Sequence, residues 1–487
     1  MPFRSGLLIA VIIVPATCFC PASILRTTTT SNLQMVGLKS KYDFARGHPN
    51  PSLLPTAEMK EIMLSVVNDA TGSSFGNDAD DENDKRTLCL NYGHEQGSPE
   101  LLRELRSFLD RHTANDDTGS AKLDDSAKNS IIITHGVSQG IDLICSTQLA
   151  PGDVVWVERP TYFLVADIFR SHRLVVRGMP MIHPNSNGGT GGVDVKRLVD
   201  MVESGKLSAP KMMYLVPTHQ NPTGHTMPVE DRILLAKFTK KHGVLVVADE
   251  VYHLLDWGDE NVDGQRPARM AEFNKMDSSD EGDATDSAGC CISVSSFTKI
   301  FAPGVRCGWI EAPERIVHSI AQHGYIQSQG GLAPFVGDLI MCRALVDRIA
   351  DNYLKKLNKE YADRARKICA ILQEDERIDL PNGCPTGGYF LWVRFPQDVD
   401  SEEFLKFCVD QGTDVRFRPG ALCDAFANHL DGEEQISNDE ASGVTSTSFR
   451  SYARLCFADL DTRNLEDGSK ELVRAFKMYL ENVDKCR

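Results

Sequence analysis

The stretch SVSSFTKIFAPGVRCGWI, residues 293–310, begins as an apolar run and passes into a turn that contains Lys299 and Arg306. A proline and a glycine separate the two basic residues, so a regular helix is not expected to join them. A charged lysine beside a hydrophobic core is unfavourable, because burial removes its hydration. Lys299 is therefore either solvated or placed there for chemistry that needs a buried amine.

The chain around this stretch alternates between short apolar runs and helical patterns. The runs SIIITHG, DVVWVE, KMMYLVP, GVLVVADE and CISVSSF each end in turn residues, as buried strands do. Between them lie patterns such as PELLRELRSFLD, and PVEDRILLAKFTKKHG, which has Pro228 at its start and Gly243 after its end. Continuous apolar strands separated by helices predict an α/β fold whose mainly parallel sheet is covered by helices on both faces.

Beyond about residue 334 the pattern changes to long amphipathic helices, over roughly 335–373, followed by GGYFLWVRF. This last run alternates large apolar residues and predicts a strand buried on one face, within a smaller α+β domain. Four inserts are expected to be surface loops: about 71–85, the glycine-rich NSNGGTGG, 259–288 and 431–447. The predicted organisation is a presequence (1–35), an N-terminal arm and small-domain segment with an acidic insert (36–86), a large domain (87–333) and a small C-terminal domain (334–487).

Composition limits the function classes. The 487 residues are 41% hydrophobic and 25% charged, as in ordinary globular proteins of two or three domains. The net charge of -16 disfavours nucleic acid or an anionic membrane as the main partner. The fourteen cysteines form no Cys-x-x-Cys pair and the histidines show no metal-ligand spacing, so we predict no structural metal and mostly buried free thiols.

The N-terminus has the pattern of a targeting sequence. MPFRSGLLIAVIIVPATCFCPAS contains an apolar run, Gly6–Val14, that is too short to span a bilayer and is typical of a signal-peptide core. The following ILRTTTTSNLQM is rich in Ser and Thr, basic and free of acids, as transit peptides are. The pair resembles the two-part presequences that direct proteins to plastids bounded by extra membranes, with Phe19 after the cleavage point. Mitochondrial or secretory addresses stay open, and no stable membrane association is expected once the presequence is removed.

Polar residues that follow the predicted strands are the candidates for a site, because ligands bind at the carboxyl ends of such strands. Five strand ends supply these groups: Asn221, Asp249 with Tyr252, Ser296 with Lys299 and Arg306, Tyr162, and a small-residue turn that opens a helix near Val137 and Ser138. A pyridoxal phosphate site needs this set of groups. Its aldehyde needs a lysine, its phosphate needs a helix N-terminus, hydroxyls and an arginine, and its ring nitrogen needs a carboxylate.

The same motifs resemble the class I/II aminotransferases of the fold-type-I, aspartate-aminotransferase-like superfamily, over about residue 42 to the C-terminus. They are YGHEQGSPELLRELRSFL, HGVSQGIDL, PGDVVWVERPTY, NPTG, ADEVY, SFTKIFAPGVRCGW, GGYFLWVRF and RLCFA, in the order of the family. The region around Lys299 is most similar to 2-aminoadipate and kynurenine-type transaminases. The resemblance implies a seven-stranded large-domain sheet, a smaller C-terminal domain and pyridoxal 5'-phosphate as cofactor.

The resemblance also implies roles for individual residues. Lys299 matches the Schiff-base lysine that moves the proton, and Asp249 matches the partner of the pyridine nitrogen. The remaining cofactor contacts implied are Asn221 and Tyr252 at the phenolic oxygen, Ser296, Arg306, Val137 and Ser138 at the phosphate, Tyr162 on the ring face, and Tyr92 at the phosphate of the partner subunit. Arg454 and Gly47, with Asn221, match the groups that bind the substrate α-carboxylate. A shared site of this kind implies a homodimer that acts on amino-acid and 2-oxo-acid substrates.

The chain departs from the family pattern at two places. His219 and Gln220 stand before Asn221, where small or apolar residues are common, so the pocket wall there is expected to differ. Arg416 and Arg418 precede Pro419. If either faces the site, an acidic substrate side chain is favoured; a solvated loop arginine is the other interpretation.

The fold leaves the reaction open, because one superfamily hosts several reactions of the same cofactor. Transamination by ping-pong chemistry through Lys299 is the predicted reaction, and a carbon–sulfur β-lyase or another amino-acid lyase is the alternative. A transcription regulator with this domain would carry an N-terminal winged helix, and here that stretch is a presequence and a short arm.

Overall fold

The structure is a computed structural model, and it describes residues 40–71, 91–112, 130–182, 192–258, 268–275, 289–425 and 449–486. The predicted presequence lies outside these residues. So do most of the first insert, nearly all of NSNGGTGG, and the fourth insert. The boundaries of the domains stay predictions.

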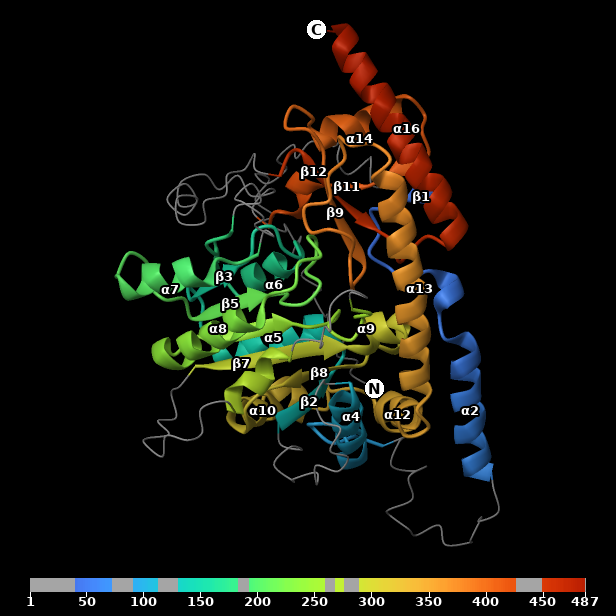
Figure 1. Cartoon of the computed structure of the whole chain (residues 1–487). Coiled ribbons are helices and arrows are strands. Elements are labelled where there is room, and N and C mark those ends of the chain that lie inside the picture. Colours follow the sequence, from blue (N-terminus) through green and yellow to red (C-terminus); the bar gives the residue numbers. More distant parts are fainter. Residues whose placement is uncertain are drawn as a thin grey trace, which may run out of the picture. The chain divides into compact units, whose positions relative to one another are not determined.

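A seven-stranded sheet forms the centre of the large domain, as predicted (Figure 1). Its strands are β2 (Ile131–Thr134), β3 (Val154–Val157), β4 (Val175–Gly178), β5 (Met212–Leu215), β6 (Leu245–Asp249), β7 (Cys290–Ser296) and β8 (Gly308–Glu311). Their order is β2-β8-β7-β6-β5-β3-β4, and only β8 runs antiparallel to its neighbours. The sheet is therefore mainly parallel, and the carboxyl ends of the parallel strands meet at one edge.

Helices cover both faces of this sheet (Figure 1). Alternate strand residues enter two separate cores: Val247 and Ile292 pack with α5 (Val137–Gln148) and α6 (Val165–Ser171), and Val246 and Cys291 pack with α7 (Val195–Glu203) and α8 (Val229–His242). Each strand needs apolar side chains on both of its faces, and for this reason the strand sequences are apolar throughout. The other helices of this region are α4 (Pro99–Arg111), α9 (Phe297–Ile300), α10 (Glu314–Ala321) and α11 (Gly324–Gln327).

The helix signals in the sequence are confirmed. All five apolar residues of the α4 pattern are buried: Leu101, Leu102, Leu105, Phe108 and Leu109. Helix α8 has Pro228 as its N-cap and ends at Gly243, whose φ of 65° is the left-handed conformation that favours glycine.

The C-terminal region contains η5 (Phe335–Met341), α12 (Cys342–Val346), α13 (Ile349–Leu372), α14 (Ser401–Asp410) and α16 (Thr462–Cys486). Its sheet has the order β11 (Arg418–Pro419), β12 (Tyr452–Cys456), β9 (Phe390–Arg394). The N-terminal segment joins this region, because β1 (Tyr42–Asp43) pairs in parallel with β10 (Val415–Arg416) and α2 (Thr56–Thr71) follows.

Two structural predictions from the sequence are wrong in detail. Strand β9 is buried on both faces rather than one, because Leu391 and Val393 enter the first core while Trp392 enters the second. The third insert is not a loop throughout, since η3 (Met270–Lys275) lies within it and buries Met270 and Phe273. The acidic stretch that follows η3, from Asp277 to Asp286, made the whole insert look like a loop.

The described cysteines with described side chains are free thiols, and all except Cys384 are buried. Within the described part of the chain, no helix is both long and apolar enough to cross a membrane. No cluster of His, Cys, Asp and Glu in those residues is arranged to hold a metal ion.

Candidate active site

Lys299 lies where β7 passes into α9, at the carboxyl edge of the large sheet. Ser296 ends the strand and caps the helix, since its Oγ accepts a hydrogen bond from the Thr298 amide at 3.0 Å. The Lys299 side chain is half-buried, and its Nζ donates to the Gly47 carbonyl at 2.7 Å and lies 5.0 Å from the centre of the Tyr389 ring. Burial lowers the pKa of this amine to about 8. Lys299 is therefore not an ordinary surface lysine, which answers the question raised by the sequence.

Asp249, the last residue of β6, is a buried carboxylate beside this amine. The Tyr214 hydroxyl donates to its Oδ2 at 2.8 Å. Burial raises the pKa of Asp249 to about 6, while that hydrogen bond opposes the rise. Among the described residues no cation forms an ion pair with Asp249, so the site has a negative group available for a positively charged partner.

Arg454 brings three predicted substrate contacts together. Its Nη1 donates to Asn221 Oδ1 at 3.0 Å, its Nη2 donates to the Ala45 carbonyl at 2.6 Å, and its guanidinium lies 4.2 Å from the centre of the Phe390 ring. Its Nε is buried without a hydrogen-bond partner. Gly47 is near, and an added Cβ there would lie 2.9 Å from Phe390 Cζ. The predicted carboxylate-binding residues therefore converge although 407 sequence positions separate Gly47 from Arg454.

Two tyrosines complete the inner part of the site. Tyr252 is buried and packs against Tyr389 and Phe390 with ring centres 5.5 and 5.8 Å apart. Tyr162 is half-buried, and its pKa is raised by burial and then by Asp249, while Arg454 lowers it. Tyr162 is thus close enough to both charged groups to interact with them electrostatically.

The opposite end of the site is an anion cradle. Helix α5 begins at Val137 and Ser138 after Gly136, and no side chain caps its N-terminus. Arg306 Nη2 donates to the His135 carbonyl at 3.0 Å, and an added Cβ on Gly136 would lie 2.9 Å from this Nη2. Free amides at a helix N-terminus beside an arginine favour a phosphate group.

Tyr92 is the one predicted site residue that the described chain does not place with the others. It is 79% exposed. The predicted role of Tyr92 at the phosphate of a partner subunit stays a prediction.

The unusual residues before Asn221 support the turn itself. Gln220 is buried, donates to the Pro160 carbonyl at 2.7 Å and accepts from the Thr223 hydroxyl at 2.6 Å. His219 has a φ of 49°, and its Nε2 lies 3.2 Å from Asp256 Oδ2. These contacts hold the loop that positions Asn221.

Sequence patterns did not single out three residues that the structure places in the site. Thr298 Oγ1 lies 2.7 Å from Ser296 Oγ and accepts from Arg306 Nη1 at 3.4 Å. Tyr214 binds Asp249, and Tyr389 donates its hydroxyl to the Lys299 carbonyl at 3.0 Å. A hydroxyl directly before Lys299 was a usable signal, whereas the two tyrosines lie in apolar runs and look like core residues.

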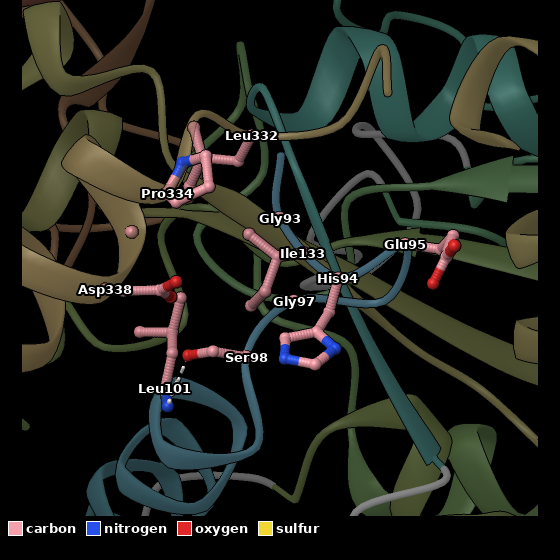
Figure 2. A pocket seen from close by; sticks show the side chains of 11 residues that line it. Gly93, His94, Glu95, Gly97, Ser98, Leu101, Ile133, Leu332, Pro334 and Asp338 are labelled. Atoms are coloured by element: carbon pink, nitrogen blue, oxygen red, sulfur yellow. Dashed lines mark hydrogen bonds between the residues drawn. The ribbon is translucent and has the colours of Figure 1, made fainter. Parts of the chain in front are cut away.

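A separate small cavity lies at the start of α4 and contains none of the predicted site residues (Figure 2). Its volume is about 10 Å³, which is room for about one water molecule. Figure 2 shows Asp338 and Ser98 beside each other on its wall. It is lined by Gly93, His94, Glu95, Gly97, Ser98, Leu101, Ile133, Leu332, Pro334, Gly337 and Asp338.

Comparison with known proteins identifies the family. The sequence pattern of the family "Aminotransferase class I and II" matches residues 69–471. This chain is a class I/II aminotransferase. The aminotransferase is 25% identical to "Aromatic-amino-acid aminotransferase 1" of Thermococcus litoralis, over 91% of this chain and 90% of that protein. It is 23% identical to "2-aminoadipate transaminase" of Thermus thermophilus, over 90% of each chain.

A solved structure of similar fold is the multiple substrate aminotransferase of Thermococcus profundus. It has a TM-score of 0.70 and 22% identity, and the match covers 95% of this chain and 97% of that one. The predicted fold class is thereby confirmed. The transaminase prediction is confirmed by the family and its named relatives, and the lyase alternative gains no support from them.

The family implies pyridoxal phosphate, and three observations show that the aminotransferase's residues fit this group. The N-terminus of α5 is uncapped beside Arg306, the Asp249 carboxylate is buried without an ion pair among the described residues, and Arg454 Nε is buried without a partner. A phosphate would bind at the α5 N-terminus and Arg306, a protonated ring nitrogen would pair with Asp249, and a substrate carboxylate would bind Arg454.

Proposed function

We propose that this aminotransferase binds pyridoxal phosphate through the converged residues and uses Lys299 as its catalytic amine. Lys299 would hold the aldehyde, Asp249 the ring nitrogen, Asn221 and Tyr252 the phenolic oxygen, and Tyr162 one face of the ring. The phosphate would lie at Val137 and Ser138, Ser296, Thr298 and Arg306. The observation that carries this proposal is the half-buried Lys299 amine, with a pKa lowered to about 8, between Gly47, Arg454 and Asp249.

The cofactor, when bound, supplies an aldehyde for the amino group and a ring that withdraws electrons from the substrate α-carbon. The protein supplies orientation and proton transfer. Arg454 binds the α-carboxylate with its planar fork, which fixes the α-hydrogen relative to Lys299 Nζ. Because burial lowers the pKa of this amine, it accepts and returns a proton near neutral pH more readily than an exposed lysine.

The proposal is tested with Lys299→Ala and with Lys237→Ala as a control, since Lys237 is an exposed lysine on α8. Borohydride treatment of the wild-type and control holoenzymes should attach the cofactor to the peptide that contains residue 299, seen by mass spectrometry. The Lys299 variant should show no label and lose about 10²- to 10⁴-fold in transamination rate. Cofactor trapped on the protein in that variant would contradict the proposal.

The reaction is tested by measuring 2-oxo-acid formation from a panel of amino acids with and without 2-oxoglutarate as acceptor. Without the acceptor a transaminase releases at most one equivalent of 2-oxo acid per site, so repeated turnover needs the acceptor, whereas a lyase turns over without it. Turnover that is independent of acceptor would overturn the assignment of ping-pong transamination.

The active enzyme is proposed to be a homodimer in which Tyr92 of one subunit reaches the phosphate of the other. Its 79% exposure leaves the Tyr92 hydroxyl accessible to a second subunit, and the match of Tyr92 to the family's tyrosine at the partner's phosphate supports this role. The proposed destination is an organelle, with the plastid favoured over the mitochondrial and secretory routes on the pattern of residues 1–35. Imaging a fluorescent fusion of the first fifty residues distinguishes the three addresses.

A further inference from the structure

A second arginine lies beside Arg454 on the small sheet. Strands β11 and β12 are antiparallel, and their register places Arg418 directly opposite Arg454. Directly opposed residues of an antiparallel pair project from the same face of the sheet. Arg418 is therefore on the face from which Arg454 reaches Asn221, and it is not a solvated loop arginine.

The Arg418 side chain is held in place by neutral groups. Its guanidinium lies 3.6 Å from the centre of the Phe163 ring, and its Nε and Nη2 donate to the Leu422 carbonyl at 3.3 and 2.9 Å. The Cys423 thiol is a further hydrogen-bond partner. The guanidinium thus has a fixed aromatic platform on one side, and none of these partners carries a formal negative charge.

Hydrogen bonds connect the loop that contains Leu422 and Cys423 to the loop that contains Tyr162. Arg159 donates to both carboxylate oxygens of Asp424, at 3.2 and 2.5 Å, and the Thr161 amide donates to the Cys423 carbonyl at 3.2 Å. Tyr162 is adjacent to Phe163, with ring centres 6.0 Å apart. The platform under Arg418 is therefore continuous with the residue proposed to lie on the cofactor ring.

The described residues provide Arg418 with no negatively charged partner. In the described part of the chain no carboxylate pairs with Arg418 or with Arg454. The pKa of Arg418 is lowered by burial, and nearby Arg454 lowers it further. By contrast, Arg106 and Arg269 share the Glu311 carboxylate at 2.6 and 2.9 Å. Two partly desolvated like charges are unfavourable unless an anion joins them.

We propose that Arg418 binds the second carboxylate of a dicarboxylic amino acid and of its 2-oxo acid, while Arg454 binds the α-carboxylate. The inference rests on the proposed function and adds the substrate class to it. Guanidinium groups bind carboxylates through two parallel hydrogen bonds, so each arginine accounts for one end of such a substrate. An α-carboxylate alone needs only Arg454, and the platform of Phe163 would then have no purpose beyond packing.

The variant Arg418→Met tests this assignment, because methionine keeps an unbranched apolar stem over Phe163 and removes the charge. Arg197→Met on α7 is the control, an exposed arginine outside the site. We expect kcat/KM for glutamate or 2-aminoadipate to fall about 10- to 100-fold in the Arg418 variant, and for leucine or phenylalanine to change less than about threefold. Arg418→Lys should retain part of the preference.

Binding to the unreacted holoenzyme gives a second readout that is independent of turnover. The wild-type enzyme should bind glutarate at least about tenfold more tightly than pentanoate in calorimetric titrations, and Arg418→Met should abolish the difference. Equal loss for both substrate classes, or a dicarboxylate preference that survives in Arg418→Met, would overturn the assignment. If the variant does not fold, equal affinity of the wild-type enzyme for the two acids overturns it instead. Absence of transamination with every donor would instead refute the proposed function, since glutarate binding measures Arg418 separately.

Discussion

The protonation of single residues in this site depends on the free-energy cost of burying a charge. Asp249 illustrates it, because a carboxylate at the end of a buried strand has lost water and receives one hydroxyl, from Tyr214, and one weak backbone contact, from Val251. The folded protein therefore holds the Asp249 proton more tightly than the unfolded chain does. A cationic partner would remove that cost, which is the reason to expect a protonated ring nitrogen there.

The stability of the cofactor-free protein should reflect this cost. The pKa of Asp249 rises from 3.8 to about 6 on folding, so the folded state binds more protons between these values and stability falls as pH rises through them. Above pH 6 the full cost, about 3 kcal/mol, is present. We expect Asp249→Asn to gain stability relative to wild type by about that amount between pH 4 and pH 7, measured by urea unfolding. Adding pyridoxal phosphate should reverse the order at pH 7, and parallel pH curves for the two proteins would contradict the assignment.

At the scale of elements, the decisive feature is where strands end and helices begin. The carboxyl ends of β2, β6 and β7 bring the start of α5, Asp249 and Lys299 to one edge of the sheet. The Gly136 turn before α5 has a φ of 96° and lies against Arg306, so backbone conformation and side-chain space both require glycine. The anion cradle is therefore a property of the strand-to-helix junction.

Gly136→Ala should weaken binding of the phosphate group specifically. The added Cβ would displace Arg306, so we expect the Kd of pyridoxal phosphate to rise about tenfold while the Kd of pyridoxal, which lacks the phosphate, stays nearly constant. Gly152→Ala is the matched control, because Gly152 has a φ of 94° and open space around its Cβ position. Both variants should lose about 1 kcal/mol of stability from backbone strain. Fluorescence titration gives the affinities, and equal phosphate affinity in the two variants would refute the cradle.

At the scale of the whole molecule, the site is proposed to need two subunits. Lys299→Ala should be nearly inactive alone because it lacks the catalytic amine. Tyr92→Ala should be impaired alone because it lacks the contact to the partner's phosphate. Co-expressed, they should form mixed dimers in which one site has both Lys299 and the partner's Tyr92 intact. We expect such mixtures to regain up to about half of the wild-type activity per mixed dimer, because one of its two sites is restored.

Tyr325, 49% exposed, provides the control, since Tyr325→Ala should keep wild-type activity alone and should gain none per intact Lys299 when it is co-expressed with Lys299→Ala. Sedimentation confirms that the Tyr92 variant remains dimeric. Mixed dimers without regained activity would show that each site is complete within one subunit.

The local sequence determined the type and the approximate ends of the main elements, and with them most of the site. Strand runs that are apolar throughout, the Pro228 and Gly243 boundaries of α8, and polar residues directly after strands all act over a few residues, so they can be seen in the chain itself. Family resemblance added the roles of Asn221, Arg454 and Gly47, which spacing alone does not reveal.

Only the tertiary structure decided which distant side chains meet. Tyr214 reaches Asp249 because β5 and β6 are neighbours, Gly47 meets the Lys299 amine across 252 positions, and Arg418 stands opposite Arg454 because of the register of β11 and β12. Strand order and register result from packing of the whole sheet, in which a shift of one residue would turn every side chain to the other face. No short stretch of sequence contains that information, and for this reason the pair of arginines became evident only in the folded chain.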